Sequence, residues 1–429
     1  MNKLFKKEVS RGILLLGIIL VFAMAPICAH AQNSGSLTVW SFTNEIKDMI
    51  NNHYKPAHSK VKITFSMTEL DKDYRKKLDT LLASGKKAPD VFALEAAFVR
   101  KYVESGQLLD LTDVYMANRQ KLMQYPVDVG TYNGRVYALS WQATPGAMFY
   151  RRSLAKKYLG TDDPKTVQTY FANINKFLDT AKLLKTKSNG ACIVVPQYSE
   201  LINPYLSGRS SPWIVNGKLV IDPMVERFMD MAKTVHDSNY HILEAYAWSD
   251  QWYAGMRDEL KDGSGKAVEV FAYFLPTWGL SYVLKANAPA TSGDWAMIQG
   301  PIPYSQGGTW LAAWKNTPNP AAAKELIRYL TAADDFMEMH ARVTGDLVSN
   351  QTVVDRVKGS YSEPFLGGQN HYAEFAEMAK NVNGKLLQGT DYDIMVFFSE
   401  AVNDFVFGGK TMKDALAGFT TKVENYLKR

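Results

Sequence analysis

Two short stretches of the sequence hold residues that could do catalytic chemistry, and neither completes a catalytic motif. Gly263-Ser264-Gly265-Lys266 is similar to the end of a phosphate-binding loop, but the first glycine of that loop is missing. Ala267 also stands where the loop needs a Ser or Thr for magnesium. Ser153 and Lys156 have the S-x-x-K spacing of acyl enzymes without the companion motifs. Neither stretch predicts an enzyme.

The histidines and carboxylates give no catalytic or metal-binding pattern either. There is no H-E-x-x-H, and the pairs His53/His58 and His236/His241 are five residues apart, which is wrong for one helical face. A secreted glycosidase needs two facing carboxylates, which any distant Asp and Glu could provide in space. We therefore expect no cofactor, no metal and no catalytic residue, with a secreted glycan hydrolase as the less favoured alternative.

The N-terminus has the three regions of a secretory signal peptide. Four basic residues precede an apolar run from Gly12 to Ala25, and the small-residue sequence Ala29-His30-Ala31 follows. We expect cleavage before Gln32. A membrane anchor is the alternative, but the run is shorter than the roughly 20 residues a span needs. Cys28 also allows a lipid-anchored form, although Ile27 fits poorly before a lipidated cysteine.

Composition narrows the remaining classes. Cleavage would leave about 400 residues, enough for two or three ordinary domains. The net charge of the whole chain is only +6, and no dense basic stripe is present, which argues against a nucleic-acid-binding protein. Cys192 would be the single cysteine of the mature chain, so no internal disulfide is expected and Cys192 is interpreted as a small core residue.

Hydrophobic periodicity predicts alternating strands and helices in the first part of the chain. Strands are expected at 37–42, 61–65 and 91–94, each followed by an amphipathic helix, which favours a largely parallel sheet. The later part is more helical. One long helix is expected from Asp163-Pro164 through Ala181, and three helices near 371–384, 392–407 and 411–428.

The segment from Tyr132 to Gly160 predicts a passage between two domains. Asn133-Gly134 is a two-residue hairpin turn, and the apolar runs 136–141 and 147–150 are separated by Thr144-Pro145-Gly146. Ser153 is expected to cap a short helix that stops at Gly160.

Several short motifs, in this order, resemble those of the extracellular solute-binding proteins of bacterial ABC importers, the maltose-binding-like family. They are LTVWSF, SGKKAPDVFALE, VESGQLLDL, NGRVYAL, MFYRRSLAKKYLG, FLPTWG and GGTWLAAWKNTPNPAAAKELIRYLT. The resemblance implies a periplasmic-binding-protein-like α/β fold, with two lobes of mixed parallel sheet and flanking helices joined by a multi-strand hinge. After a signal peptide at 1–31, lobe one would comprise 32–142 plus 309–350, and lobe two 143–308 plus 351–429.

The same resemblance implies a function. A monomeric, non-enzymatic protein in the periplasm or outside the cell would hold a carbohydrate in the cleft between its lobes and deliver it to an ABC transporter permease. The chain is rich in aromatic residues and weakly charged, which favours a sugar. A non-sugar solute such as a polyol or a phosphodiester is the alternative within the class.

The resemblance also carries site residues over to this sequence. Thr43, Asn44 and Glu45 follow the first strand, and Glu95 ends the third, where polar ligand contacts are placed in the family. Helix capping and a favourable helix dipole are the plainer explanations of these residues. Trp278 matches an aromatic that stacks on a sugar ring, with a core position as its alternative.

The remaining candidates lie near the three hinge crossings that the resemblance implies, at the Tyr132–Gly160 segment, near Gly308 and near Asp346, or on nearby helices. Trp248 and Trp252 are one helical turn apart and would either pack or line the cleft. Tyr198 and Glu200 follow the Cys192 strand in a loop. The residues placed at the crossings are Trp141, Gln142, Gly308, Thr309, Trp310 and Asp346.

Overall fold

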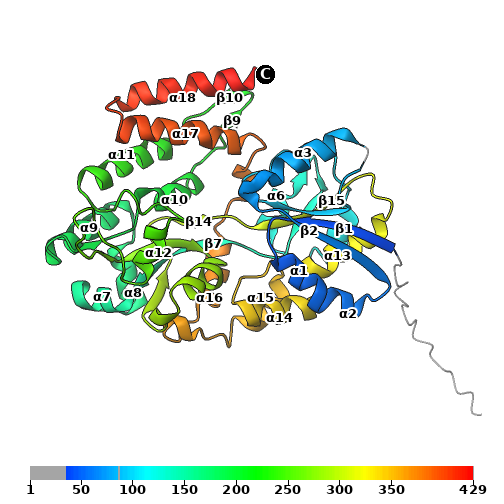
Figure 1. Cartoon of the computed structure of the whole chain (residues 1–429), viewed down its shortest axis with the longest axis horizontal. Coiled ribbons are helices and arrows are strands. Elements are labelled where there is room, and N and C mark those ends of the chain that lie inside the picture. Colours follow the sequence, from blue (N-terminus) through cyan, green and yellow to red (C-terminus); the bar gives the residue numbers. More distant parts are fainter. Residues whose placement is uncertain (1–34, 86, 429) are drawn as a thin grey trace, which may run out of the picture.

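The computed structural model describes residues 35–85 and 87–428, which form two α/β lobes lying side by side (Figure 1). The predicted signal peptide and Cys28 lie outside the described residues. Within the described ranges, none of the helices combines the length and the apolar character that crossing a membrane requires. The expected two-lobed α/β architecture is confirmed.

Lobe one is built on a five-stranded sheet whose first strands are parallel. The order is β2 (Val61–Met67), β1 (Gly35–Ser41), β3 (Val91–Glu95), β15 (Thr309–Ala313) and β6 (Ala138–Ser140). β1 pairs in parallel with β2 and β3, whereas β15 runs antiparallel to β3 and β6. The helices of this lobe include α1 (Glu45–Met49), α3 (Arg75–Ser84), α4 (Val99–Val103), α5 (Thr112–Asn118), α6 (Gln124–Val129), α13 (Pro320–Ala332) and α14 (Asp334–Thr344).

Lobe two has an antiparallel sheet with β7 (Pro145–Arg151) in the middle. β12 (Ala272–Pro276) lies on one side of β7, and β13 (Trp295–Ile298) and β14 (Tyr304–Ser305) also pair with it. Every residue of β7 is buried, which explains its continuous apolar sequence. Its helices include α7 (Arg152–Leu159), α8 (Pro164–Tyr170), α9 (Ile174–Lys187), α10 (Ile202–Ser207), α11 (Pro223–Asp237), α12 (Asp250–Met256), α16 (His371–Ala379), α17 (Asp391–Val406) and α18 (Met412–Leu427).

The predicted hairpin turn is confirmed, whereas one predicted helix is two separate helices. Asn133 and Gly134 both have positive φ, 48° and 74°, and join β4 (Thr131–Tyr132) to β5 (Arg135–Val136) as predicted. The single helix predicted from Asp163 to Ala181 is wrong, because α8 ends at Tyr170. Asn173 then caps α9 by accepting a hydrogen bond from the Lys176 amide. An asparagine side chain that satisfies free helix amides favours a new helix start over continuation.

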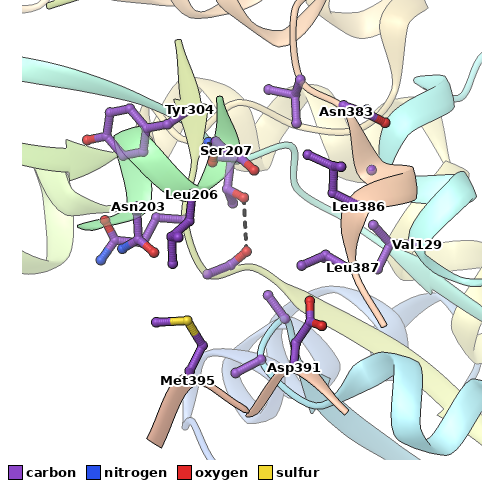
Figure 2. A pocket seen from close by; sticks show the side chains of 18 of the residues that line it. Val129, Asn203, Leu206, Ser207, Tyr304, Asn383, Leu386, Leu387, Asp391 and Met395 are labelled. Carbon is purple, nitrogen blue, oxygen red and sulfur yellow. Dashed lines mark hydrogen bonds between the residues drawn. The ribbon is translucent and has the colours of Figure 1, made fainter. Parts of the chain in front are cut away.

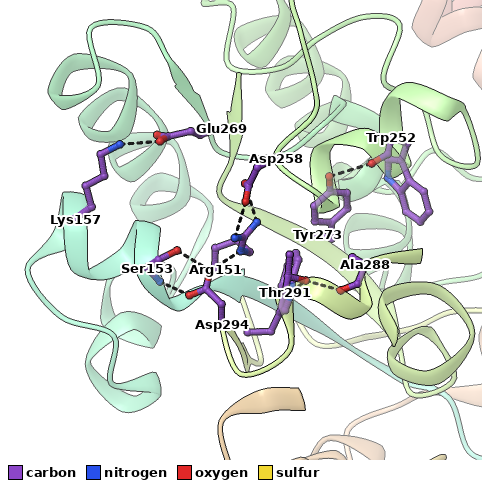
Figure 3. A network of polar contacts seen from close by, with 11 residues as sticks. Arg151, Ser153, Lys157, Trp252, Asp258, Glu269, Tyr273, Ala288, Thr291 and Asp294 are labelled. Carbon is purple, nitrogen blue, oxygen red and sulfur yellow. Dashed lines mark hydrogen bonds and ion pairs between the residues drawn. The ribbon is translucent and has the colours of Figure 1, made fainter. Parts of the chain in front are cut away.

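The predicted capping role of Ser153 is also wrong. Helix α7 begins at Arg152, so Ser153 lies inside its first turn. Figure 3 shows Asp294 accepting hydrogen bonds from the Ser153 amide (2.7 Å) and from Arg151 Nε (2.8 Å). Arg151 also makes a bidentate pair with Asp258. The amide at the start of α7 is therefore bound by the carboxylate of Asp294, from a distant segment, and not by the Ser153 side chain.

Three chain segments cross side by side between the lobes. The first crossing (140–144) lies between the second (305–309) and the third (346–350). The Ala143 amide donates to Leu347 O (2.7 Å), and the Gln306 amide of the second crossing donates to Thr144 O (3.1 Å). One hydrophobic cluster, including Trp141, runs through this region into both lobes. The lobe boundaries themselves stay a proposal, since α15 (Gln351–Val357) after the third crossing packs on α14 of lobe one.

Gly146→Ala is expected to destabilise the protein, because a Cβ at Gly146 would lie 2.0 Å from Cζ of the buried Tyr304 ring. Overpacking of this kind costs roughly 1–3 kcal/mol of unfolding free energy, measured by urea denaturation. The matched control is Gly418→Ala on the exposed face of α18, where no atom lies within 4 Å. The control should be neutral or gain roughly 0.5–1 kcal/mol. Equal stability of the two variants would contradict the packing at β7.

Candidate functional site

A cavity of about 490 Å³ lies where the two lobes face each other. Clefts of this size hold small organic ligands. Lobe one contributes the end of β3, helix α6 and the Trp310 ring, while lobe two contributes α10, the loop after it, β14 and the start of α17. Gly307 of the second crossing and Thr144 of the first also line it. Figure 2 shows side chains from these separate elements around one space.

The cavity wall combines apolar surfaces with a small number of polar groups. Leu206, Leu386 and Met395 supply apolar contacts, and Asn203 and Asn383 supply amides (Figure 2). The aromatic residues Trp213, Tyr304 and Trp310 also belong to the lining. This mixture suits a ligand with both apolar faces and hydrogen-bonding edges.

Glu95 is one of the two predicted ligand-binding residues that line this cavity, the other being Trp310. It ends β3, and its Oε2 accepts a hydrogen bond from the Ala97 amide (2.7 Å). Burial raises the pKa of Glu95 to about 7, while backbone hydrogen bonds oppose the shift. A carboxyl group that is partly protonated near neutral pH can both donate to and accept from a ligand hydroxyl.

The residues after β1 face a different part of the space between the lobes. Thr43 Oγ1 accepts from the Glu45 amide at the start of α1 (3.2 Å), whereas Asn44, the N-cap residue, is exposed and makes no side-chain cap bond. Glu45 reaches across to lobe two, where the Tyr282 hydroxyl donates to its Oε1 (2.8 Å). These three residues are not among those that line the cavity. Burial, followed by the charge of Asp346, raises the pKa of Glu45 to about 8.

Three of the predicted crossing residues form one buried hydrogen-bond network. Gln142 Nε2 donates to Asp346 Oδ2 (2.6 Å), and the Thr309 amide donates to Gln142 Oε1 (3.0 Å). Thr277, at the end of β12, donates to the other oxygen of Asp346. Burial raises the pKa of Asp346 to about 6. The polar groups of these residues hold the crossings together and do not point into the cavity.

The other crossing residues divide between packing and the cavity. Trp141 is fully buried in the shared cluster. Gly308 accepts a hydrogen bond from the Ala96 amide through its carbonyl oxygen (3.1 Å). Trp310 donates from Nε1 to Pro126 O (2.8 Å), and its ring contributes to the cavity wall.

The predicted tryptophans form a stack outside the cavity lining. Trp248 is 56% exposed and lies parallel to Trp278, with ring centroids 6.1 Å apart. Trp248 precedes α12 with a φ of 72°, so the prediction that it shares a helix with Trp252 is wrong. Trp252 is buried and donates from Nε1 to Glu200 Oε1 (2.7 Å). Tyr198 is buried too, which leaves Trp248 and Trp278 as the accessible pair.

Sequence reasoning missed most of the lobe two wall, including Arg209, Trp213, Asp391 and Met395. Arg209 and Trp213 belong to the loop 208–213, which also contains Gly208 and Pro212. A basic and an aromatic residue in such a loop could have indicated a binding surface. Asp391 lies in the first turn of α17, where its plain explanation was the helix dipole.

The comparisons with known proteins agree with this architecture. The model of a family described as bacterial extracellular solute-binding protein matches residues 52–364. A lactose-binding protein of Rhizobium radiobacter is 26% identical over 398 residues, covering 88% of this chain and 87% of that protein. An arabinooligosaccharide-binding protein of Bacillus subtilis (strain 168) is 21% identical over 422 residues, covering 88% and 89%.

Solved structures share the fold over nearly the whole described chain. A crystal structure of an extracellular solute-binding protein of family 1 has a TM-score of 0.77 at 21% identity, covering 92% of this chain and all of the other. An ABC-transporter-associated binding protein of B. animalis subsp. lactis Bl-04, in complex with β-1,6-galactobiose, has a TM-score of 0.72 at 20% identity. That match covers 92% of this chain and 98% of the other.

Glu45→Gln is expected to change how stability depends on pH. The pKa of Glu45 is raised from 4.5 to about 8, so the folded protein holds this proton more tightly than the unfolded chain. The contribution of protonated Glu45 to the unfolding free energy is fully present below about pH 4.5 and is lost as the pH rises toward 8. Gln keeps an acceptor for Tyr282 but cannot ionise. The unfolding free energy of the wild type minus that of Glu45→Gln should therefore fall between pH 5 and pH 8 in urea titrations.

The control is Glu377→Gln, an exposed residue paired only with Lys380 on the surface. Its difference from the wild type should not reproduce the fall assigned to Glu45. A difference between wild type and Glu45→Gln that stays constant from pH 5 to pH 8 would contradict the buried, raised-pKa environment of Glu45.

Proposed function

The chain belongs to the bacterial extracellular solute-binding proteins, and from that premise we propose that it captures a carbohydrate between its lobes for an ABC importer. The ligand is a mono- or oligosaccharide, and the ABC transporter permease receives it. The observation that carries this proposal is the interlobe cavity of about 490 Å³, with Glu95 at its edge and rings in its wall. Aromatic rings suit the C–H faces of sugars, and Glu95 suits their hydroxyls.

The named ligands of similar proteins support the sugar class. The two relatives are named for lactose and for arabinooligosaccharides. A further structural neighbour, from Bifidobacterium longum, is described in complex with lacto-N-biose. A weakly charged chain with many aromatic residues is consistent with a neutral ligand of this kind.

Capture proceeds by closure of the lobes about the three crossings. Contacts that join the lobes away from the hinge include Tyr282 with Glu45 (2.8 Å) and the Arg75 guanidinium over the Tyr392 ring (3.7 Å). A ligand that binds the closed form better than the open form shifts the population toward closure. The stacked Trp248 and Trp278, beside Gly307, extend the proposed binding surface.

The remaining features of the proposal concern how the protein works in the cell. It acts as a monomer without enzymatic activity, because delivery requires that the ligand leave unchanged. Export depends on a signal peptide at 1–31, which is cleaved to release the mature protein. In the alternative form, Cys28 is lipidated and holds the protein at the membrane surface.

The test of this function is a thermal-shift screen of the mature protein with lactose, β-1,6-galactobiose and arabinooligosaccharides. A ligand that binds only the native state adds about 2.7 kcal/mol of stability at 100 times its Kd. We expect at least one sugar to raise the melting midpoint and to be recovered unchanged. Small-angle scattering with that sugar should give a smaller radius of gyration. Shifts with polyols or phosphodiesters alone would contradict the sugar proposal, and turnover would identify a hydrolase.

Glu95→Gln is expected to weaken binding of the sugar found in that screen. The variant keeps an acceptor for the Ala97 amide but loses the stronger hydrogen bonds that an ionised carboxylate makes. The expected loss is roughly 1–2 kcal/mol of binding free energy, measured by titration calorimetry at pH 8. Glu377→Gln on the surface serves as the control and should bind as the wild type does. An unchanged affinity for Glu95→Gln would remove Glu95 from the site.

A further inference from the structure

Two oppositely charged side chains of lobe two lie in the cavity wall, each with an atom that has no partner. Arg209 comes from the loop after α10, and Asp391 from the first turn of α17. They are 8% and 7% exposed. Arg209 Nη1 and Asp391 Oδ1 are buried and make no hydrogen bond within the described part of the chain. Buried polar atoms of charged groups are normally paired, so these two need an explanation.

The rest of each side chain is held in place. Arg209 Nε donates to Leu206 O (2.9 Å), and its guanidinium lies over the Trp213 ring at 4.4 Å. Asp391 Oδ2 accepts from the Gln388 amide (3.2 Å). In Figure 2 the carboxylate of Asp391 points toward the space beside Leu387 and Met395. Anchored side chains with one unused donor and one unused acceptor are typical of a preorganised polar site.

The two groups do not satisfy each other. Among the ion pairs of residues 35–85 and 87–428, none joins Arg209 to Asp391 or to the neighbouring Asp222. Burial raises the pKa of Asp391 to about 7, and the charge of Arg209 opposes the shift. Both residues belong to the cavity lining, so a ligand in the cavity is the partner that their unused atoms lack.

We propose that Arg209 and Asp391 are a donor–acceptor pair that anchors adjacent hydroxyls of a neutral sugar in the interlobe cavity. This inference rests on the proposed carbohydrate-binding function and deepens it. A hydroxyl group both donates and accepts, so one hydroxyl bonds to Asp391 while it or its neighbour accepts from Arg209. An unbranched apolar ligand could satisfy neither atom.

The charges of the wall select against acidic sugars. Of the residues that line the cavity, Glu95 and Asp391 are the acidic ones and Arg209 is the basic one. The other polar lining groups, such as Asn203, Asn383 and Gln306, are neutral. A ligand carboxylate would therefore meet two acids and one base, and like charges in a partly buried site repel strongly.

The experiment is titration calorimetry at pH 8 with lactose and β-1,6-galactobiose as neutral probes and digalacturonate as the acidic probe. The variants are Arg209→Gln and Asp391→Asn. The controls are Arg227→Gln and Asp237→Asn, which remove the same charges from exposed positions on α11. The melting midpoint of each unliganded variant is measured in parallel.

We expect each cavity variant to bind the better neutral disaccharide at least tenfold more weakly, while both controls bind as the wild type does. The unliganded midpoint should stay level or rise, because each variant removes a buried charged group that has one unsatisfied atom. A purely structural role would lower the midpoint without changing the affinity. Wild-type protein should bind digalacturonate at least tenfold more weakly than the neutral probe, a measurement that does not depend on the variants folding.

The outcomes separate this inference from the function on which it rests. Neutral disaccharides that bind the wild type and both cavity variants within twofold would overturn the role of Arg209 and Asp391 and leave the sugar-binding function standing. Equal or tighter binding of digalacturonate would overturn the neutral-sugar class. If no sugar of the screen binds the wild type, both the function and this inference fail.

Discussion

The buried carboxylate of Asp346 is the interaction on which the arrangement of the two lobes depends. It accepts hydrogen bonds from Gln142 on the first crossing and from Thr277 at the end of β12. Gln142 in turn accepts from the Thr309 amide on the second crossing. A buried carboxylate is costly unless such donors surround it. The network therefore ties the first crossing to two segments that lie 167 and 204 residues further along the chain, and it fixes where the chain passes between the lobes.

The position of the cavity follows from this network at the crossings. Because the crossings are held together, the ends of β3 in lobe one and the start of α17 in lobe two are brought to face each other across Gly307. Glu95, Arg209 and Asp391 come from three distant segments, and they line the same cavity because the lobes are arranged in this way. Farther from the hinge the lobes also touch, for example where the Arg75 guanidinium lies over the Tyr392 ring.

Many turns and helix ends could be predicted from the sequence because they depend on the backbone preferences and side chains of a few neighbouring residues. The Asn133-Gly134 hairpin, the helix end at Gly160 and the cap Asp163 all appear as predicted. The errors arose where a distant or competing partner decided the outcome. Asp294 serves the amide of Ser153 from 141 residues away, and Asn173 starts a new helix inside an apolar pattern that looked continuous.

The sequence alone determined the strand–helix alternation, the placement of the three crossings and the position of Glu95 at a strand end. Backbone preference and hydrophobic periodicity are local properties, and the order of short motifs identifies the family. Only the tertiary structure decided which polar residues are free to meet a ligand. Gln142 and Asp346 use their polar groups on each other, whereas Arg209 and Asp391, with no sequence motif to mark them, line the cavity. Hydrogen-bond partners are chosen by packing between distant segments, and no local pattern contains that choice.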